Sequence, residues 1–297
     1  MATSVLVKNF SLYQKTLAQK VILEGIGVHS GSFSSLCIMP APAGMGIVFK
    51  NSLFSDPSEA LVIGRVIPES AMHATVLKAK SWGLSTVEHL MAACSFFDID
   101  NLYIEVTGFE IPILDGSALQ FLQAFELAGV VEQSAKKLYL TPQETILIQD
   151  AHGRFISITP HEDSADYNLS VEYSADFNHP LVGALTFSGQ ITNNFFEHEV
   201  APARTFGFLE QLSYLRSHKL AQGSTLGNTA VMGDDAYLNE LRFDDECVRH
   251  KVLDLLGDLA LLGHRLVGTI RAAKTGHSFN RLVIQHYLEH PEAWRLF

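Results

Sequence analysis

The chain has 297 residues, of which 47% are hydrophobic and 18% are charged, and its formal net charge is -11. This composition supports one large or two modest globular domains and excludes long disordered segments. The acidic balance argues against nucleic-acid binding, which needs a basic surface. We therefore expect a globular protein without a nucleic-acid partner.

Cysteine usage and the N-terminal segment indicate the compartment. The cysteines are odd in number and widely spaced: Cys37, Cys94 and Cys247. This usage is typical of reduced thiols and not of a disulfide framework. The first residues carry no signal-peptide cleavage site, and no stretch has the length of a transmembrane helix. We predict a soluble, cytoplasmic protein.

The first half is predicted to form strands and two helices. Short β-rich stretches punctuated by Gly and Pro predict strands at 21–31, 34–42, 46–51 and 101–108. Helical periodicity predicts helices at 85–97 and 115–129. Ser85 stands three residues before Glu88, which resembles a capping box, and Gly129 ends the second helix.

The second half repeats this plan. Strands are predicted at 144–150, 154–160, 167–173 and 265–273. Helices are predicted at 248–263 and 277–290. The segment between the halves is polar and contains a proline. It divides the chain into a first domain over 1–131, a linker over 132–143 and a second domain over 144–297.

The two halves align as an internal repeat. When residues 87–89 are aligned with 248–250, residues 115–117 fall within one residue of 275–277. Helix, strand, turn and helix recur in the same order at almost the same spacing. The repeat predicts an α+β fold, a duplicated two-domain β-α-α-β sandwich. Each domain is a sheet with two helices, and the helix layers face each other with a site between them.

A polar stripe on the helix at 248–263 carries the first candidate chemistry. Positions four apart on a helix drift by only about 40° per step, so His250, Asp254 and Asp258 share one stripe. Ionisable groups beside a leucine-rich face are costly unless they are paired or bound to a metal. A zinc site and a simple pair between His250 and Asp254 on a solvated face fit this helix equally well.

The repeat favours the metal site, because it places His89 on the equivalent helix of the other half. His89, His250 and Asp254 make three protein ligands and leave a fourth position for water, which is the pattern of a catalytic zinc. Glu88 is then available as a base. His277, at a Gly turn that opens a helix, is either a structural residue or a general acid whose imidazolium Asp258 holds.

Several motifs together resemble one enzyme family. They are STVEHLMAA, IPILDGSA, ARTFGF, VRHKVLDLLGDL and AAKTGHSFN, with GIGVHSG near the N-terminus. They are similar to motifs of the zinc-dependent UDP-3-O-acyl-N-acetylglucosamine deacetylases, which release acetate in the committed step of lipid A synthesis in Gram-negative bacteria. The resemblance runs from about Gln14 to Trp294. It implies a monomeric, duplicated α+β sandwich that acts on an acylated UDP-sugar between its helix layers.

The resemblance also implies roles for residues within the motifs. His89, His250 and Asp254 would hold zinc or ferrous iron. The implied catalytic residues are Glu88 as general base, His277 as general acid, Asp258 to orient His277, and Thr205 to hold the attacking water and the oxyanion. The implied substrate-binding residues are Lys251 near the pyrophosphate or sugar, Phe206 against the nucleotide-sugar, Phe208 and Gly223.

Members of the family carry an insert in the second domain that forms a tunnel for the acyl chain. The matching segment is 208–231, whose leucines and tyrosine also fit an ordinary amphipathic helix. Many members have Gly-Leu-x-x-Gly-Gly-Ser after the tunnel helix. Here two of these glycines are replaced, by Lys219 and Ser224. Side chains are therefore expected where backbone alone lines the passage in the family, and the resemblance does not fix the acyl-chain length or the tunnel width.

Two other functions are compatible with parts of the pattern. A different zinc amidohydrolase, such as a peptidase, is disfavoured because the chain has no HExxH. A non-catalytic paralogue that binds an acyl-UDP-sugar without turnover would fit the altered glycines. The intact set of acid, base and metal ligands favours the enzyme.

Overall fold

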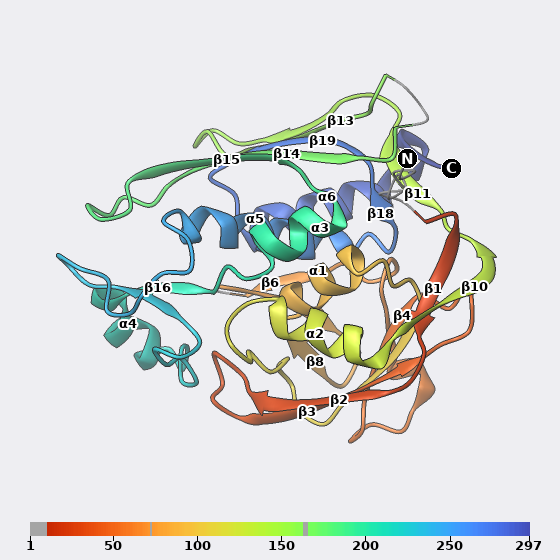
Figure 1. The fold of residues 1–297 in the computed structure, drawn as a ribbon, viewed down its shortest axis with the longest axis horizontal. Coiled ribbons are helices and arrows are strands. Elements are labelled where there is room, and N and C mark those ends of the chain that lie inside the picture. The colour runs from red at the N-terminus through yellow and green to blue at the C-terminus, as the bar shows by residue number, and fades with distance from the viewer. Residues whose placement is uncertain (1–10, 72, 163–165) are drawn as a thin grey trace, which may run out of the picture.

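Two five-stranded sheets form the outer layers of the molecule, and helices from both halves lie between them (Figure 1). The computed structural model describes residues 11–71, 73–162 and 166–297. Helices of the first half lie against the first sheet, namely α1 (Glu88–Phe96) and α2 (Leu119–Ala128). Helices of the second half lie against the second sheet, namely α5 (Glu246–Ala260) and α6 (His277–Glu289). The layers therefore run sheet, helices, helices, sheet.

The two large sheets share one strand order. The first is β2-β3-β9-β4-β5 and the second is β12-β13-β19-β14-β15. In each, the central strand pairs antiparallel with one neighbour and parallel with the other. The first sheet comprises β2 (Val21–Ile26), β3 (Phe33–Pro40), β4 (Ile47–Asn51), β5 (Leu61–Val62) and β9 (Leu102–Val106). The second comprises β12 (Ile146–Gln149), β13 (Phe155–Thr159), β14 (Leu169–Asp176), β15 (Ala184–Gln190) and β19 (Gly268–Ala273).

This shared topology confirms the predicted α+β fold and its duplication. In each half the central strand lies between two helices in sequence, since β9 follows α1 and precedes α2, and β19 follows α5 and precedes α6. Alternation along the strands places apolar side chains on the inner face. In the first sheet, for example, Ile38, Ile104 and Phe49 are cross-strand neighbours, and all three are buried.

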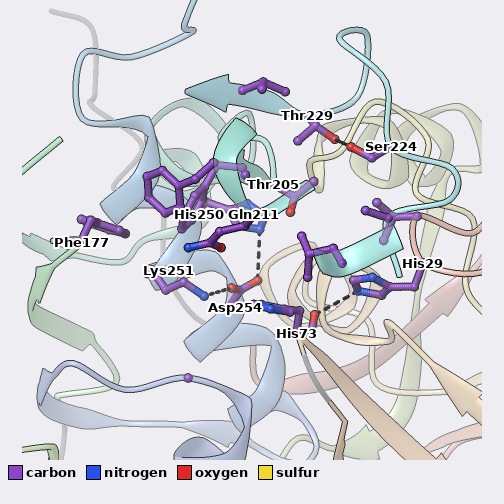
Figure 2. Close-up of a pocket in the computed structure, with 18 of the residues that line it drawn as sticks. His29, His73, Phe177, Thr205, Gln211, Ser224, Thr229, His250, Lys251 and Asp254 are labelled. Carbon is purple, nitrogen blue, oxygen red and sulfur yellow. Dashed lines mark hydrogen bonds and ion pairs between the residues drawn. The ribbon is translucent and has the colours of Figure 1, made fainter. Parts of the chain in front are cut away.

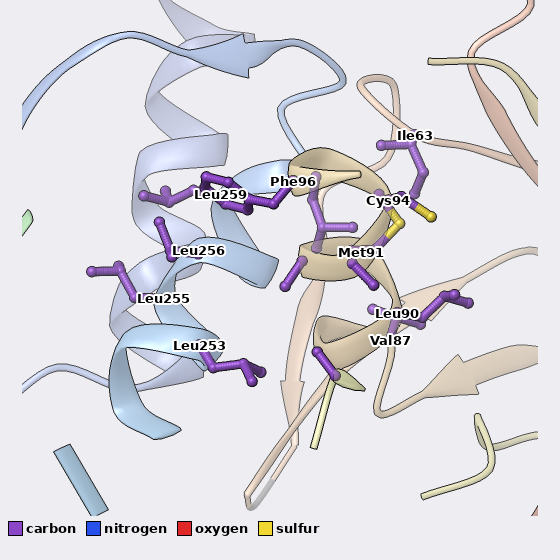
Figure 3. Packing of buried hydrophobic residues seen from close by; sticks show 14 of the residues in the cluster. Ile63, Val87, Leu90, Met91, Cys94, Phe96, Leu253, Leu255, Leu256 and Leu259 are labelled. Atoms are coloured by element: carbon purple, nitrogen blue, oxygen red, sulfur yellow. The ribbon is translucent and has the colours of Figure 1, made fainter. Parts of the chain in front are cut away.

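α1 and α5 pack against each other at the centre of the molecule. Leu90 and Met91 of α1 belong to the same buried cluster as Leu253 and Leu256 of α5 (Figure 3). The backbones approach closely at Gly257, where an added Cβ would lie 2.0 Å from the carbonyl oxygen of Glu88. Any larger residue would push the helices apart, so this glycine allows the start of α1 to meet the polar stripe of α5.

The start of α1 differs from the prediction. The capping box is wrong, because α1 begins at Glu88 and its N-cap, Val87, makes no side-chain hydrogen bond. Ser85 instead ends β8 (Gly83–Ser85), and its N–H donates to the carbonyl of Phe109 at 3.0 Å. Because Ser85 is paired in the sheet, it does not cap α1. The Glu88 side chain is therefore not bound to a capping residue and is available to the polar stripe of α5.

Smaller boundary differences have local causes. α2 begins at Leu119 rather than at Asp115, because the Asp115 carboxylate accepts a hydrogen bond from the N–H of Ser117 and holds a turn there. The strand predicted at 265–273 is divided into β18 (Arg265–Leu266) and β19. The division falls at Val267, next to Gly268, whose φ of 134° suits glycine.

Between β5 and α1 the first half has a small sheet that the sequence pattern did not predict. Its order is β6-β7-β8, with β6 (Glu69–Ala71) and β7 (Ala74–Lys78). The second half has a longer insert at the equivalent place, between β15 and α5, and the segment predicted as the insert, 208–231, lies inside it. This longer insert contains α3 (Asn193–Phe195), α4 (Leu212–Ser217) and two parallel strands, β16 (Phe206–Phe208) and β17 (Ala230–Met232).

Short strands run through the segment predicted as a linker, 132–143. β10 (Val130–Lys136) pairs with β1 (Tyr13–Leu17), and β11 (Tyr139–Pro142) pairs with β18 and with β20 (Trp294–Leu296). The division into domains at this segment stays a prediction. Among the helices of the described residues, none combines the length and the apolar character that a bilayer span requires.

Candidate metal centre and active site

Two histidines and an aspartate converge where α1 meets α5. The ligand atoms of His89, His250 and Asp254 lie within 4.8 Å of one another, and all three residues are buried. Asp254 Oδ1 lies 3.6 Å from His89 Nε2 and 3.3 Å from His250 Nε2. Zinc ligands at about 2.0–2.2 Å in a tetrahedral arrangement are roughly 3.3–3.6 Å apart. The three groups therefore fit one small divalent cation, and the alternative of a solvated pair is wrong.

The hydrogen bonds and charges of this cluster also suit a cation. His250 Nδ1 donates to the carbonyl of Ala203 at 3.0 Å, which leaves the lone pair on Nε2 free to bind a metal. Burial lowers the pKa of His250 to about 4 against the opposing effect of Asp254, so the ring is neutral. His250 and Lys251 hold the pKa of Asp254 well below its usual range despite burial. Neutral imidazoles and a carboxylate are the ligand forms that zinc binds.

Glu88, His277 and Asp258 form a second cluster beside the first. Glu88 Oε1 lies 3.7 Å from His277 Nε2. The other ring nitrogen, Nδ1, donates to Asp258 Oδ2 at 2.9 Å. His277 Nε2 also lies 3.9 Å from Asp254 Oδ2 of the first cluster. A carboxylate and an imidazole thus face each other next to the candidate metal ligands, as a proton acceptor and a proton donor.

The surroundings shift the pKa of both groups toward neutral or alkaline pH. Burial raises the pKa of Glu88 to about 7, although His277 opposes the shift. Burial acts to lower the pKa of His277, but the carboxylates of Asp258 and Glu88 outweigh it and raise the value to about 10. Between these two values the carboxylate and the imidazolium coexist, which is what an acid–base pair requires.

Two residues that the sequence analysis did not single out hold Asp258. The hydroxyl of Thr75, on β7, donates to Asp258 Oδ1 at 2.5 Å. The amide of Asn280, on α6, donates to Asp258 Oδ2 at 2.8 Å. Asn280 stands three residues after His277, so helical spacing was an available signal for it. No local pattern pointed to Thr75, because it lies 183 residues from Asp258 in sequence.

Thr205 is held near the metal ligands by contacts from both halves. Its N–H donates to the carbonyl of Gly116 at 2.7 Å. The preceding residue, Arg204, pairs with buried Glu246 at 2.9 Å. Gly116 has a φ of 87°, and an added Cβ would meet the carbonyl oxygen of Asn228 at 1.8 Å, so a glycine is required there. The turn at 115–117 therefore positions a residue of the other half.

The two clusters open into a cavity of about 1120 Å³. Thr205, His250, Lys251 and Asp254 lie together on its wall, and Lys251 Nζ reaches Asp254 Oδ2 at 2.9 Å (Figure 2). The ammonium also lies 5.6 Å from the ring centroid of Phe206. The lining further includes Glu88, His89, His277, Phe206 and Phe208. Every predicted site residue except Asp258 and Gly223 therefore contributes to this cavity.

Gly223 has a different place from the one expected. It packs against the loop at 27–31, where an added Cβ would lie 2.3 Å from the carbonyl oxygen of Gly27. Its N–H donates to the carbonyl of Val28 at 3.0 Å. The next residue, Ser224, lines the cavity in its stead.

The insert supplies an apolar part of the cavity wall, from residues Leu209, Leu212, Leu215, Leu226, Val231 and Leu238. A hydroxyl pair interrupts it, since Ser224 Oγ lies 2.8 Å from Thr229 Oγ1 (Figure 2). Thr229 Oγ1 in turn donates to Asn228 Oδ1 at 2.9 Å. Lys219, the other altered glycine position, is exposed and outside the described lining, with a φ of 59°.

Comparison with known proteins gives the family. The model of the UDP-3-O-acyl N-acetylglycosamine deacetylase family matches residues 14–289. The chain belongs to this family. A UDP-3-O-acyl-N-acetylglucosamine deacetylase of Chromobacterium violaceum is 37% identical over 287 residues, which cover 95% of this chain and 92% of the relative. The deacetylase of Cellvibrio japonicus is 38% identical, with the same shares covered, and that of Syntrophotalea carbinolica is 36% identical over 96% of this chain and 91% of the relative.

Family membership confirms the resemblance seen in the motifs and the prediction of an amide-hydrolysing enzyme. It also agrees with the metal-ligand geometry, since a catalytic metal is expected in this family. The identity of the metal and the roles of single residues remain predictions. The cavity lining also includes His29, His73 and Tyr173, which the sequence analysis did not single out. Of these three residues, only His29 lies in a motif that the sequence analysis noted, GIGVHSG.

Proposed function

We propose that the chain hydrolyses the N-acetyl amide of UDP-3-O-acyl-N-acetylglucosamine and releases acetate and UDP-3-O-acyl-glucosamine. The reaction would serve lipid A synthesis in the cytoplasm, with zinc, or alternatively ferrous iron, held by a monomeric enzyme. One observation carries the proposal: Glu88 and His277 face each other beside the ligand cluster in the cavity wall. The names of the relatives support the substrate.

The proposed mechanism divides proton transfer between two side chains. His89, His250 and Asp254 would hold the metal, which when bound would lower the pKa of a water and polarise the carbonyl. Glu88 accepts the proton of the attacking water. Thr205 and protonated His277 donate hydrogen bonds to the oxyanion that forms. His277 then gives its proton to the amide nitrogen, so that the amine leaves and acetate is released.

The cavity is suited to a ligand with a charged end and an apolar end. Lys251 and Lys274 both line it, in a protein whose net charge is -11. Phe206 lies near Lys251, and Phe208 lies beside Phe206, so the two rings offer surfaces for a sugar or nucleotide. The leucines of the insert also line the cavity and suit an acyl chain. These features support an acylated nucleotide-sugar, rather than a peptide, as the substrate.

The direct test is acetate release from UDP-3-O-acyl-N-acetylglucosamine by the purified protein. Activity is measured on the protein as isolated, after chelation, and after zinc or ferrous iron is added back. Release that chelation abolishes and metal restores is the expected result. Absence of release over several acyl lengths, from folded protein with bound metal, would favour the non-catalytic paralogue. Release from an acetylated peptide alone would favour another amidohydrolase.

The pH dependence of kcat/KM follows from the two shifted pKa values. The active form needs Glu88 ionised and His277 protonated. Activity is expected to rise with pH as Glu88 (pKa about 7) loses its proton, and to fall as His277 (pKa about 10) loses its own. A bound dication favours the carboxylate and the neutral imidazole, so both limbs are expected at or below these values. A flat profile from about pH 5 to 10 would contradict the pair.

Ser224 and Thr229 are expected to limit the length of the acyl chain. The double variant Ser224→Gly/Thr229→Ala removes both hydroxyl groups. It would widen the cavity at the place where these two side chains meet. We expect the ratio of kcat/KM for longer to shorter acyl chains to rise by about tenfold or more, the usual worth of a methylene in a fitted pocket. Lys219→Gly is the matched control, because its side chain is exposed. An equal change in that control would place the determinant elsewhere.

A further inference from the structure

Thr75 makes contacts with all three members of the second cluster, namely Glu88, His277 and Asp258. It lies on β7, in the small sheet of the first half, and is 2% exposed. Its hydroxyl donates to Asp258 Oδ1 at 2.5 Å and lies 3.2 Å from His277 Nδ1. Its N–H donates to Glu88 Oε2 at 3.4 Å. Thr75 thus hydrogen-bonds Asp258, which is the partner of the candidate acid His277, and it also hydrogen-bonds Glu88, the candidate base.

The backbone of Thr75 is itself held at the start of α1. Its carbonyl accepts a hydrogen bond from the N–H of Thr86 at 3.0 Å, two residues before Glu88. Thr86 has a φ of 59°, a conformation that a non-glycine residue keeps only when its surroundings hold it. The position of the Thr75 hydroxyl is therefore tied to the strand and to the helix that carries Glu88.

The Asp258 carboxylate has three side-chain donors, which come from two elements. His277 and Asn280 of α6 share Oδ2, and Thr75 of β7 binds Oδ1. Without the Thr75 hydroxyl, Oδ1 would be a buried acceptor without that donor, and the carboxylate could rotate about its Cβ–Cγ bond. The His277 ring would follow, because Asp258 holds its Nδ1 at 2.9 Å.

We propose that Thr75 is a positioning residue of the reaction, which sets the spacing between Glu88 and His277 by holding Asp258. The proposal rests on the proposed function, because it assumes that this pair moves protons. Thr75 belongs to the first half and Asp258 to the second, so the acid–base geometry depends on how the two halves dock. A residue that hydrogen-bonds the partner of a catalytic group can orient that group without touching the substrate.

Thr75→Val removes the hydroxyl and keeps the shape of the side chain. We expect kcat to fall about 10- to 100-fold, with KM and metal content unchanged. Thr75→Ser keeps the hydroxyl and is expected to restore kcat. A fall of kcat in Thr75→Ser as large as in Thr75→Val would overturn the proposal, and so would a loss confined to KM.

Thr16→Val is the matched control for loss of a buried threonine hydroxyl. Thr16 is 5% exposed, donates to the carbonyl of Asn101 at 2.6 Å, and lies outside the cavity lining. This variant is expected to lose stability and to keep its kcat. In a double-mutant cycle, Thr75→Val is expected to add little to Asp258→Ala, since the first residue acts through the second. Full additivity would contradict that coupling.

A substrate-free measurement separates this proposal from the proposed function. In protein with ¹⁵N-labelled histidine and bound zinc, the Nδ1 proton of His277 is assigned by its absence in His277→Ala. Its resonance is expected to shift in Thr75→Val and to stay in place in Thr75→Ser and Thr16→Val. An unchanged resonance in Thr75→Val would overturn the proposal, even if the enzyme is active. If the resonance shifts in Thr75→Val but the wild-type protein releases no acetate, the result would count against the proposed function and not against the role of Thr75.

Discussion

Glu88→Gln protein is expected to bind metal as the wild type does and to release acetate about 10²- to 10⁴-fold more slowly. The amide has the size of the carboxylate and fills the same buried space, but it cannot accept a proton from water. Glu88 is not part of the three-ligand cluster, and its Oε1 faces His277 Nε2 at 3.7 Å. The loss should therefore appear in kcat while metal content, measured by elemental analysis, stays constant.

His277→Ala is the companion variant. It should lower turnover by a similar factor, also with constant metal content, because His277 gives its proton to the leaving nitrogen. Loss of metal in either variant would identify that residue as a ligand instead of an acid or base. Wild-type turnover in Glu88→Gln would remove Glu88 from the mechanism.

His250→Ala is expected to lower metal content sharply and to reduce activity to that of the chelated wild type. His250 presents Nε2 to the cluster, 3.3 Å from Asp254 Oδ1. Removal of one of three protein ligands leaves too few donors for a small dication. Asp254→Asn is expected to act in the same direction, because it removes the only negative charge of the ligand set.

The same effect has a readout that does not depend on catalysis. A metal that binds the folded state raises Tm, so added zinc should stabilise the wild type and leave His250→Ala unchanged. His264→Ala is the matched control, since this half-buried histidine follows α5 and lies outside the cavity lining. Equal zinc stabilisation of the wild type and His250→Ala would place the metal at other residues.

Local sequence patterns predicted many residues of the candidate site. Spacing of four residues on one helix put His250, Asp254 and Asp258 on a stripe, and the structure has all three on α5. The repeat then brought His89 to the same place, because the two halves have the same topology. The capping box at Ser85 failed for the opposite reason. The pattern was local, but backbone pairing of Ser85 with Val76 of β7 and with the segment 109–110 decided where that residue lies.

The sequence by itself determined the fold class, the duplication and the candidate ligands, because periodicity and spacing within one element depend only on neighbours along the chain. The tertiary structure decided what lies between elements. Thr75 meets Asp258 across 183 residues, and Ser224 rather than Gly223 lines the cavity. Such contacts depend on how two sheets and their helices dock. Docking is a property of packed surfaces, and no segment of the chain encodes it alone.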